Sequence, residues 1–170
     1  MNHGIYASPL GPIHLFSDNN CLTGLYLQAH IPRSTAYAAH HSEDPILRET
    51  SQWLDSYFLG KNPSSVNIPL MPSGTPFQKK VWQILLQIPY GQTVTYSQIA
   101  KQFSETMSAQ AIGQAVGKNP ISIIIPCHRV LGSNYRLTGY AGGIEAKVWL
   151  LKHEGLDAKT FIYPKKYRGK

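Results

Sequence analysis

Residues 121–130 read Ile-Ser-Ile-Ile-Ile-Pro-Cys-His-Arg-Val, an apolar run followed by a proline and three reactive or charged side chains. Four isoleucines within five residues predict a fully buried strand or an equivalent extended segment. Pro126 cannot continue a hydrogen-bonded ladder, so we expect the chain to bend there. Cys127 then stands at the end of a rigid element, beside His128 and Arg129, which favour a thiolate. We expect a reactive thiol, with an inert buried cysteine as the alternative.

The charge of the 170-residue chain is divided unevenly along its length. Residues 1–75 carry three Lys/Arg against five Asp/Glu, a net charge of −2. Residues 76–170 carry thirteen against four, a net charge of +9. A half of the chain this basic indicates a polyanionic partner, and nucleic acid is favoured over a surface that is merely soluble.

Several classes of protein are not expected from this sequence. No apolar run approaches the roughly eighteen residues of a transmembrane helix, and the N-terminus lacks a secretory signal. We therefore expect a cytoplasmic protein without membrane contact, with Cys21 and Cys127 as reduced thiols. Cys21 and the N-terminal histidines match no zinc-ligand spacing, so no metal and no cofactor is expected.

The first third of the chain predicts a small β-meander with one helix. Apolar strands are expected over 13–16 and 22–27, and a polar loop over 30–43. The dipeptide 44–45, Asp-Pro, is typical of an N-cap and first helical position, and Gly60 is typical of a helix end. None of these residues offers obvious catalytic chemistry.

The connection to the second half is expected to be extended. Residues 66–70 predict a further strand, and residues 71–74, Met-Pro-Ser-Gly, predict a linker. The apolar positions of the preceding helix all fall on one face, which indicates that it packs against the meander.

The second half contains repeated signals for helix starts. Thr-x-x-Gln occurs at 75–78 and at 95–98, and each occurrence predicts a capping box. The first of these helices is expected to reach Ile88, before a proline. Ser108 is expected to cap a further helix over 109–116. Two short helices joined by a tight turn are typical of a helix-turn-helix.

Small side chains dominate the second helix of this pair. They indicate either close packing between helices or a helix that approaches DNA without reading its bases. A sequence-specific repressor would instead carry Arg, Asn and Gln side by side. Both interpretations stay open for the small residues concerned, Ala109, Ala111, Gly113 and Ala115.

The end of the chain predicts a hairpin, a loop, a helix and a tail. The hairpin is expected over 131–137, a flexible loop over 138–143, and the helix over 144–154. Residues 161–170 alternate aromatic with basic side chains. This tail is interpreted either as a frayed basic terminus or as a contact with the DNA backbone.

Three motifs accompany the Pro-Cys-His-Arg-Val run at 126–130. They are Asn119-Pro120, Gly-Tyr-Ala-Gly-Gly at 139–143, and Trp-Leu-Leu-Lys-His-Glu-Gly at 149–155. Together they resemble the O6-alkylguanine-DNA alkyltransferases, also called methylated-DNA–protein-cysteine methyltransferases, over roughly residues 75–155.

The resemblance implies an α+β protein of two domains. An N-terminal ribonuclease-H-like α/β domain without an active site would span 1–74. A mostly helical, winged-helix-like domain with a helix-turn-helix would span 75–170 and bind DNA.

The resemblance also implies direct-reversal DNA repair. The alkyl group of O6-alkylguanine, and of O4-methylthymine, would move irreversibly to Cys127 after base flipping. A soft thiolate suits attack on an sp3 carbon, and the thioether product cannot be cleaved by any side chain here. The protein is therefore expected to act once. Its partner would be alkylated double-stranded DNA, bound without sequence preference by a monomer.

The roles of individual residues follow from the resemblance at matching positions. Cys127 resembles the alkyl acceptor, and His128, through a water, and Glu154 resemble its activating pair. Tyr96 resembles the tyrosine that turns the phosphate and donates toward guanine, and Asn119 resembles a tether to the active-site turn. The expected base pocket comprises Tyr96, Cys127, Val130, Tyr140 and Ala141. The expected DNA contacts are Thr95, Tyr96, Ser97, Ser108, Ala109, Gln110, Arg129 and Ser133.

One position departs from the family pattern. Relatives commonly place in the recognition helix an arginine that replaces the flipped nucleotide, and here that position is Gln110. Glutamine is shorter and carries no charge, so slower or weaker repair of duplex DNA is expected.

Two rival functions are considered. A non-enzymatic helix-turn-helix protein could bind alkylated DNA, but non-catalytic relatives replace the cysteine that is present here. A cysteine hydrolase could also use Cys127 and His128, but their adjacency leaves little room for its geometry, and no oxyanion-hole motif is evident.

Overall fold

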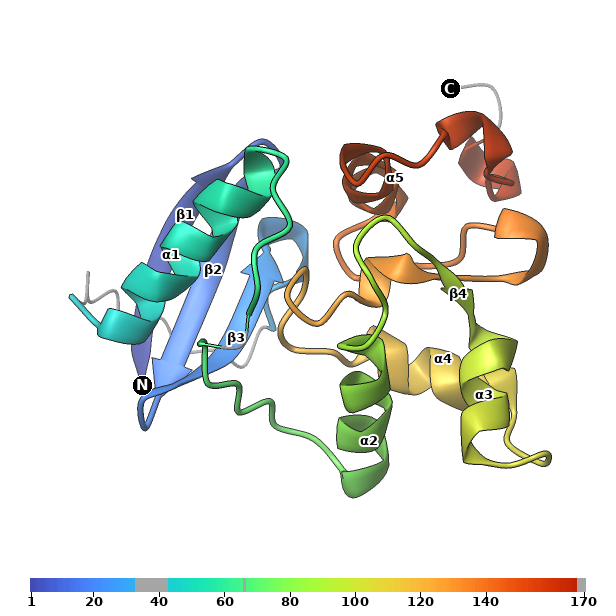
Figure 1. Cartoon of the computed structure of the whole chain (residues 1–170), viewed down its shortest axis with the longest axis horizontal. Helices are drawn as coiled ribbons and strands as arrows, with labels where there is room; N and C mark the ends of the chain where they lie inside the picture. Colours follow the sequence, from blue (N-terminus) through green and yellow to red (C-terminus); the bar gives the residue numbers. More distant parts are fainter. Residues whose placement is uncertain (33–42, 66, 168–170) are drawn as a thin grey trace. The chain divides into compact units, whose positions relative to one another are not determined.

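The computed structural model describes residues 1–32, 43–65 and 67–167, and Figure 1 follows the chain through them. The loop expected over 30–43 falls largely outside these residues. Within the described ranges, no helix combines the length and apolar character needed to cross a membrane.

The chain divides into two compact units. The first comprises Met1–Gly74 and Pro120–Ile124, and the second comprises Thr75–Asn119 and Ile125–Lys170. The chain therefore leaves the second unit after Asn119, adds a short segment to the first unit, and returns. The domain limits expected from the sequence stay a prediction.

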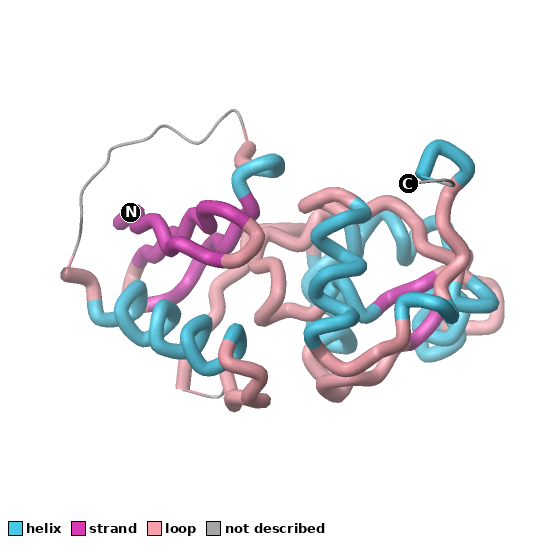
Figure 2. The backbone as a smooth tube through the Cα atoms, turned by 90° about the horizontal axis from the view of Figure 1, so that it is seen from above, coloured by secondary structure: helices cyan, strands magenta, loops and turns pink. Residues whose placement is uncertain are grey.

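The first unit is built on a three-stranded antiparallel sheet. Its strands are β1 (Asn2–Ser8), β2 (Gly11–Asp18) and β3 (Cys21–Leu27), in the order β1-β2-β3. Helix α1 (Pro45–Phe58) lies across one face of this sheet (Figure 2). The predicted meander and helix are confirmed.

The signals that begin and end α1 act as predicted. The Asp44 carboxylate accepts hydrogen bonds from the N–H groups of Ile46 at 2.9 Å and Leu47 at 3.0 Å. These bonds satisfy two of the N–H groups that a helix start leaves unpaired. Gly60, at φ +84°, adopts the left-handed conformation that ends a helix without steric strain.

The strand expected over 66–70 does not form in its described part, residues 67–70. Leu70 makes only an isolated bridge with Leu22, and the Leu22 N–H donates to the Pro69 carbonyl at 2.7 Å. Pro69 has no N–H to extend a ladder, which limits the pairing to this contact.

Residues 121–125 are buried as predicted, but they do not form a strand. The run bridges β3 only at Ile121. The Ile124 N–H then donates to the Ser122 carbonyl at 2.8 Å, which closes a three-residue turn around Ile123 at φ +69°. An apolar run predicts burial, and burial does not distinguish a strand from a turn folded into the core.

The second unit contains, among its described residues, four α-helices and a two-stranded parallel sheet. The helices are α2 (Pro76–Leu85), α3 (Tyr96–Phe103), α4 (Ala109–Gly117) and α5 (Ile144–His153). The sheet pairs β4 (Val94–Thr95) with β5 (Val130–Leu131). Helices α3 and α4 pack on each other as the predicted helix-turn-helix.

Helix α2 starts where the sequence predicts and stops earlier. The Thr75 and Gln78 side chains form the capping box, and an equivalent box starts α3. The helix ends at Leu85, because the N–H groups of Gln87 and Ile88 bond to carbonyls three residues back rather than four. The residues predicted to form the last turn of this α-helix therefore form a tighter turn of the 3₁₀ type.

The segment after β5 forms the predicted hairpin. The Gly132 N–H donates to the Arg136 carbonyl at 2.8 Å, and Ser133–Tyr135 forms a 3₁₀ turn between them. Residues 131–137 are called the wing below.

Candidate active site

Cys127 opens a short 3₁₀-helix, Cys127–Arg129, directly after the bend at Pro126. Its N–H donates to the Ile125 carbonyl at 2.7 Å, which closes a second tight turn. The cysteine is only 4% exposed. Two turns and the 3₁₀-helix therefore hold the thiol on a backbone with little freedom to move.

Asn119 links the end of α4 to this turn. Its side chain is buried, and Nδ2 donates to the Ile125 carbonyl at 2.8 Å. The same carbonyl accepts the N–H of Cys127. One backbone oxygen thus connects the helix-turn-helix with the cysteine, and the role of Asn119 as a tether stays a prediction.

The carboxylate of Glu154, the residue after α5, forms hydrogen bonds with groups from separate segments of the chain. Nε2 of His128 lies 2.8 Å from Oε1. Arg129 donates from Nη2 to Oε1 at 2.8 Å and from Nε to Oε2 at 2.9 Å. The Gly91 N–H donates to Oε2 at 3.2 Å. Because all three side chains are buried, these charges are poorly screened by water and salt.

Burial and pairing act on this cluster in opposite directions. Burial alone would raise the pKa of Glu154, but hydrogen bonds from His128 and Arg129 outweigh it and hold that pKa well below its usual range. Burial lowers the pKa of His128, and Glu154 offsets this only in part. The cluster therefore combines a carboxylate with a neutral imidazole.

The neutral imidazole has a defined tautomer. Its proton belongs on Nε2, because that nitrogen faces the Glu154 carboxylate. Nδ1 of His128 is then an acceptor, and it is buried without a hydrogen-bond partner among the described residues. A base is thus available at Nδ1.

The thiol itself is not activated by its surroundings alone. Burial raises the pKa of Cys127. The Asn119 side chain, the Lys147 charge and the Tyr140 side chain oppose this shift without cancelling it. Cys127 therefore rests as a thiol at neutral pH and needs a base to become a nucleophile.

A buried lysine beside the thiol is not among the residues predicted from the sequence. Lys147 on α5 is 1% exposed, and Nζ donates to the Val130 carbonyl at 2.7 Å. Burial lowers its pKa to about 8. A signal was present, because Ile144, Lys147 and Leu151 share the apolar stripe of that helix. A cation on such a stripe indicates a specific partner.

Tyr96 stands at the first position of α3. Its hydroxyl lies 2.6 Å from Oγ1 of Thr138. Burial raises the pKa of Tyr96, the bond with Thr138 lowers it, and a charge on Cys127 raises it. The phenol therefore stays protonated at neutral pH and lies within electrostatic reach of the sulfur.

The other residues expected in the base pocket lie on both sides of the wing. Val130 is buried on β5, with its carbonyl held by Lys147. Tyr140 and Ala141 are half-buried in the loop that precedes α5.

The expected DNA contacts differ in exposure. The exposed residues are Ser97, Ser108, Gln110 and Ser133, and the half-buried ones are Thr95, Tyr96 and Ala109. Arg129 is 9% exposed, and its Nε, Nη1 and Nη2 atoms all donate to protein acceptors, Nη1 to the Ile88 carbonyl at 2.7 Å. A DNA phosphate would have to compete with Glu154 for this guanidinium.

The small residues of α4 do not all play the same part. Ala115 is buried, and its carbonyl accepts a hydrogen bond from Nε1 of Trp82 on α2 at 2.9 Å. Close packing explains this residue. Gly113 is half-buried, and a Cβ there would lie 3.7 Å from the Tyr96 ring, so it faces the site.

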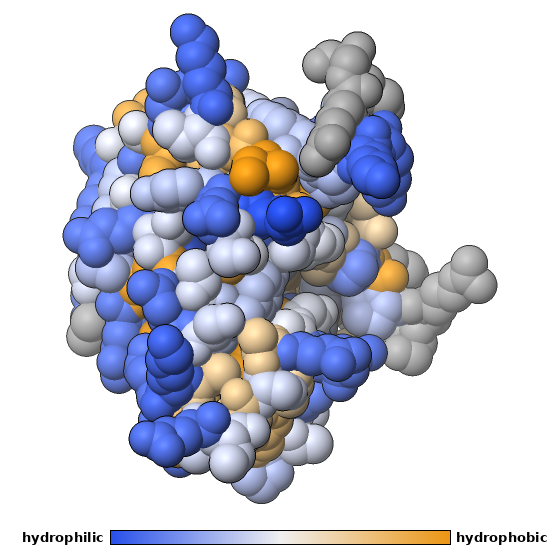
Figure 3. Space-filling model, turned by 90° about the vertical axis from the view of Figure 1, so that its right-hand side faces the viewer, coloured by the Kyte–Doolittle hydropathy of each residue, from blue (hydrophilic) through white to orange (hydrophobic). Residues whose placement is uncertain are grey.

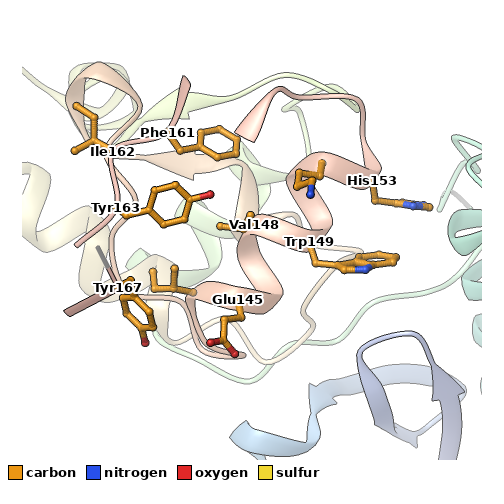
Figure 4. Close-up of a pocket in the computed structure, with 10 residues that line it drawn as sticks. Glu145, Val148, Trp149, His153, Phe161, Ile162, Tyr163 and Tyr167 are labelled. Atoms are coloured by element: carbon orange, nitrogen blue, oxygen red, sulfur yellow. The ribbon is translucent and has the colours of Figure 1, made fainter. Parts of the chain in front are cut away.

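Two features elsewhere bear on what the site can hold. No cluster of three His, Cys, Asp or Glu side chains within the described ranges is arranged to bind a metal ion. A pocket of about 1000 Å³ lies between α5 and the C-terminal segment (Figure 4). None of the expected site residues lines it.

Two family models match the chain. The model described as the ribonuclease-like domain of 6-O-methylguanine DNA methyltransferase matches residues 1–72. The model for the DNA-binding domain of the same family matches residues 76–156.

Individual relatives agree with these models. A methylated-DNA–protein-cysteine methyltransferase of Methanosarcina acetivorans is 42% identical over 91% of this chain and 99% of its own length. One of Shigella flexneri is 50% identical over 88% and 92%. A crystal structure of Mycobacterium tuberculosis OGT in complex with DNA is 39% identical, covers 91% of this chain and 92% of that one, and has a TM-score of 0.79.

A ribonuclease-like domain joined to a DNA-binding domain with a buried cysteine defines a class of DNA-repair proteins. The chain belongs to the methylated-DNA–protein-cysteine methyltransferase family. Its activity is direct-reversal repair, in which an alkyl group moves from DNA to a cysteine of the protein.

Proposed function

We propose that Cys127 is the cysteine that accepts the alkyl group from O6-alkylguanine in DNA. The geometry around the sulfur carries this proposal. A buried thiol stands on a fixed turn, next to an imidazole that is anchored on the carboxylate of Glu154. Cys21 lies on β3 of the first unit and is not part of this cluster.

His128 takes the proton from the thiol. Its Nδ1, which has no hydrogen-bond partner among the described residues, accepts this proton, and the proposed relay from the sulfur of Cys127 is a water molecule. Glu154 holds the Nε2 proton and stabilises the imidazolium that forms, as in other nucleophile–base–acid systems. Arg129 keeps Glu154 ionised, and Lys147 stabilises the developing thiolate. Arg129 thus serves the active site rather than the DNA backbone.

The thiolate then attacks the alkyl carbon. The new S–C bond forms as the bond between that carbon and O6 of guanine breaks, and the electron pair passes to the base. Tyr96 donates a proton to the leaving guanine, which would otherwise depart as an anion. The proton held by His128 then returns to Tyr96 through solvent, so both side chains regain their starting protonation. The product is a thioether on Cys127 and an unmodified guanine, and each chain acts once.

The DNA partner is double-stranded and bound without sequence preference. A nucleotide inside a duplex must be flipped out, at a cost of a few kcal/mol. Helices α3 and α4 present exposed polar side chains at their N-terminal ends, and phosphate contacts of this kind position DNA without reading sequence. The second unit of one chain supplies all of these residues, so we propose a monomer.

A pair of cysteine variants tests the assignment, because the chain has only two cysteines. A duplex with one O6-methylguanine, labelled on the methyl group, is incubated with the native protein, Cys21→Ser and Cys127→Ser. The first two are expected to gain one label per chain, and Cys127→Ser none, while all three bind the duplex equally.

The same experiment separates the rival function. A non-enzymatic protein that binds alkylated DNA would retain affinity for the lesion without gaining label in any variant. Label on Cys127→Ser would rule out Cys127 as the acceptor.

A further inference from the structure

The C-terminal segment after α5 is anchored by its aromatic side chains. Phe161 is 6% exposed, and Tyr163 and Tyr167 pack against the same core cluster. Figure 4 shows these three rings on the side of the segment that faces α5, around the pocket described above. The cluster consists of Leu131, Leu137, Ile144, Leu151 and Phe161.

The backbone of this segment also pairs with the wing. The Leu137 N–H donates to the Ile162 carbonyl at 2.9 Å, and the Ile162 N–H donates to the Tyr135 carbonyl at 3.0 Å. Arg136 and Ile162 form a parallel bridge. The segment therefore lies against the edge of the wing through this isolated bridge, and the residues that follow Ile162 leave from that edge.

The side chains that point away from the core are cationic. Lys165 and Lys166 are exposed in the 3₁₀ turn Lys165–Tyr167, and Lys159 is exposed just before Phe161. Within the described ranges, no acidic side chain forms an ion pair with them. Figure 3 shows hydrophilic side chains at the top of this side of the molecule, beside an apolar patch, and further hydrophilic side chains elsewhere on the same face.

The elements expected to touch DNA are poor in positive charge. Helix α4 contains no charged residue, and the wing contains one cation, Arg136. Sequence-independent binding depends mainly on Lys and Arg contacts to phosphates. By contrast, residues 158–170 carry five Lys/Arg and no Asp/Glu.

We propose that the C-terminal segment extends the wing and binds the DNA phosphate backbone through Lys165 and Lys166. This inference rests on the proposed function, because it requires DNA to lie along the wing at Ser133. The main-chain pairing at Ile162 supplies a fixed position next to the wing. The lysines add to the single cation of the wing, Arg136, and supply positive charge that α4 lacks.

The test is the salt dependence of binding to an undamaged duplex. The native protein is compared with Lys165→Ala/Lys166→Ala and with a control, Arg48→Ala/Lys61→Ala, which removes the same charge from exposed positions of the first unit. The slope of log affinity against log salt becomes shallower by about 0.9 for each phosphate that the protein no longer neutralises. We expect a slope smaller by about two in the tail variant and unchanged in the control.

Two further measurements complete the design. Lys165→Arg/Lys166→Arg is expected to keep the native slope, because charge rather than lysine itself is required. Transfer from the free base O6-methylguanine, which needs no DNA contact, is expected to be equal in all variants. A native slope in the alanine variant would overturn the tail contact alone. Absence of methyl transfer in the native protein would instead overturn the proposed function.

Discussion

Glu154 must stay charged although it is buried, and Arg129 makes this possible. The bidentate pair between the guanidinium and the carboxylate favours the ionised form, while burial favours the neutral one. The ionised carboxylate then fixes the tautomer of His128. Arg129 therefore acts on Cys127 only through two other side chains.

Glu154→Gln is expected to damage both stability and activity. Arg129 would keep its charge without a buried counter-charge, which costs about 3 kcal/mol. The imidazolium would lose its stabilising partner, so single-turnover transfer should fall on the order of 100-fold. Urea unfolding and single-turnover kinetics measure the two effects. Glu145→Gln, exposed on the first turn of α5, is the matched control and should match the native protein.

The lowered pKa of Glu154 also predicts the direction of a pH effect. A carboxyl whose folded pKa lies below its unfolded value near 4.5 stabilises the fold above that value. This contribution is lost as the pH falls below 4.5 through the folded pKa. The acid destabilisation should be shallower in Glu154→Gln than in the native protein, and identical acid profiles would contradict the pairing.

Lys147 predicts that stability also rises with pH in the alkaline range. Its pKa drops from 10.5 to about 8 on folding, so the unfolded chain binds more protons between these values and stability rises with pH there. The full shift corresponds to about 3 kcal/mol. Lys147→Met should lack this rise when unfolding is measured from pH 7 to pH 10. Lys152→Met, exposed on the same helix, should retain it.

The same substitution should slow the reaction. Without the cation the Cys127 pKa rises further, so less of the thiol is converted to thiolate. Single-turnover transfer by Lys147→Met at neutral pH should therefore be slower than in the native protein. Transfer at the native rate would show that the charge of Lys147 does not act on the thiol.

At the level of elements, the prediction concerns α4. Gln110 is exposed in the first turn of this helix, and the family resemblance implies an arginine at this position in other members. Gln110→Arg should raise single-turnover transfer on duplex DNA several-fold, because a longer charged side chain fills the gap and contacts phosphate. Transfer from a single-stranded oligonucleotide should not change, since no gap opens there. Equal rates of single-turnover transfer on duplex DNA for the native protein and Gln110→Arg would contradict this prediction.

Helix starts were the features most predictable from the sequence. Asp44, Thr75 and Thr95 each combine a capping side chain with a favourable first turn, and all three caps form. These signals are local, since a side chain bonds the backbone two or three residues away. The turn around Ile123 has no such local signal, because its conformation depends on tertiary packing.

The candidate site was predictable only in part, for a related reason. Cys127 and His128 are adjacent, and the motif around them is specific. The partners that come from distant segments, such as Lys147 and the Ile88 carbonyl, are brought together only by folding. Arg129 is the clearest example. Its residue type predicts a contact with DNA phosphate, but its guanidinium donates hydrogen bonds to the buried Glu154.

At the scale of the whole molecule, a buried acceptor predicts that repair weakens the fold. Cys127 is 4% exposed, and an added methyl group must be accommodated within packed surroundings. Overpacking of this kind costs about 1–3 kcal/mol. Thermal unfolding of the methylated protein should therefore occur at a lower temperature than that of protein treated with unmethylated duplex. Equal unfolding temperatures would mean that the site has room for the product.

The most direct measurement is the location and amount of methyl on the native chain. The protein is mixed with an excess of duplex carrying one O6-methylguanine. It is then digested, and the masses of its peptides are measured by mass spectrometry. We expect one methyl group per chain, on the peptide that contains Cys127, and no further transfer after that. Methyl on the Cys21 peptide, or continued turnover by a single chain, would contradict Cys127 as a single-use acceptor.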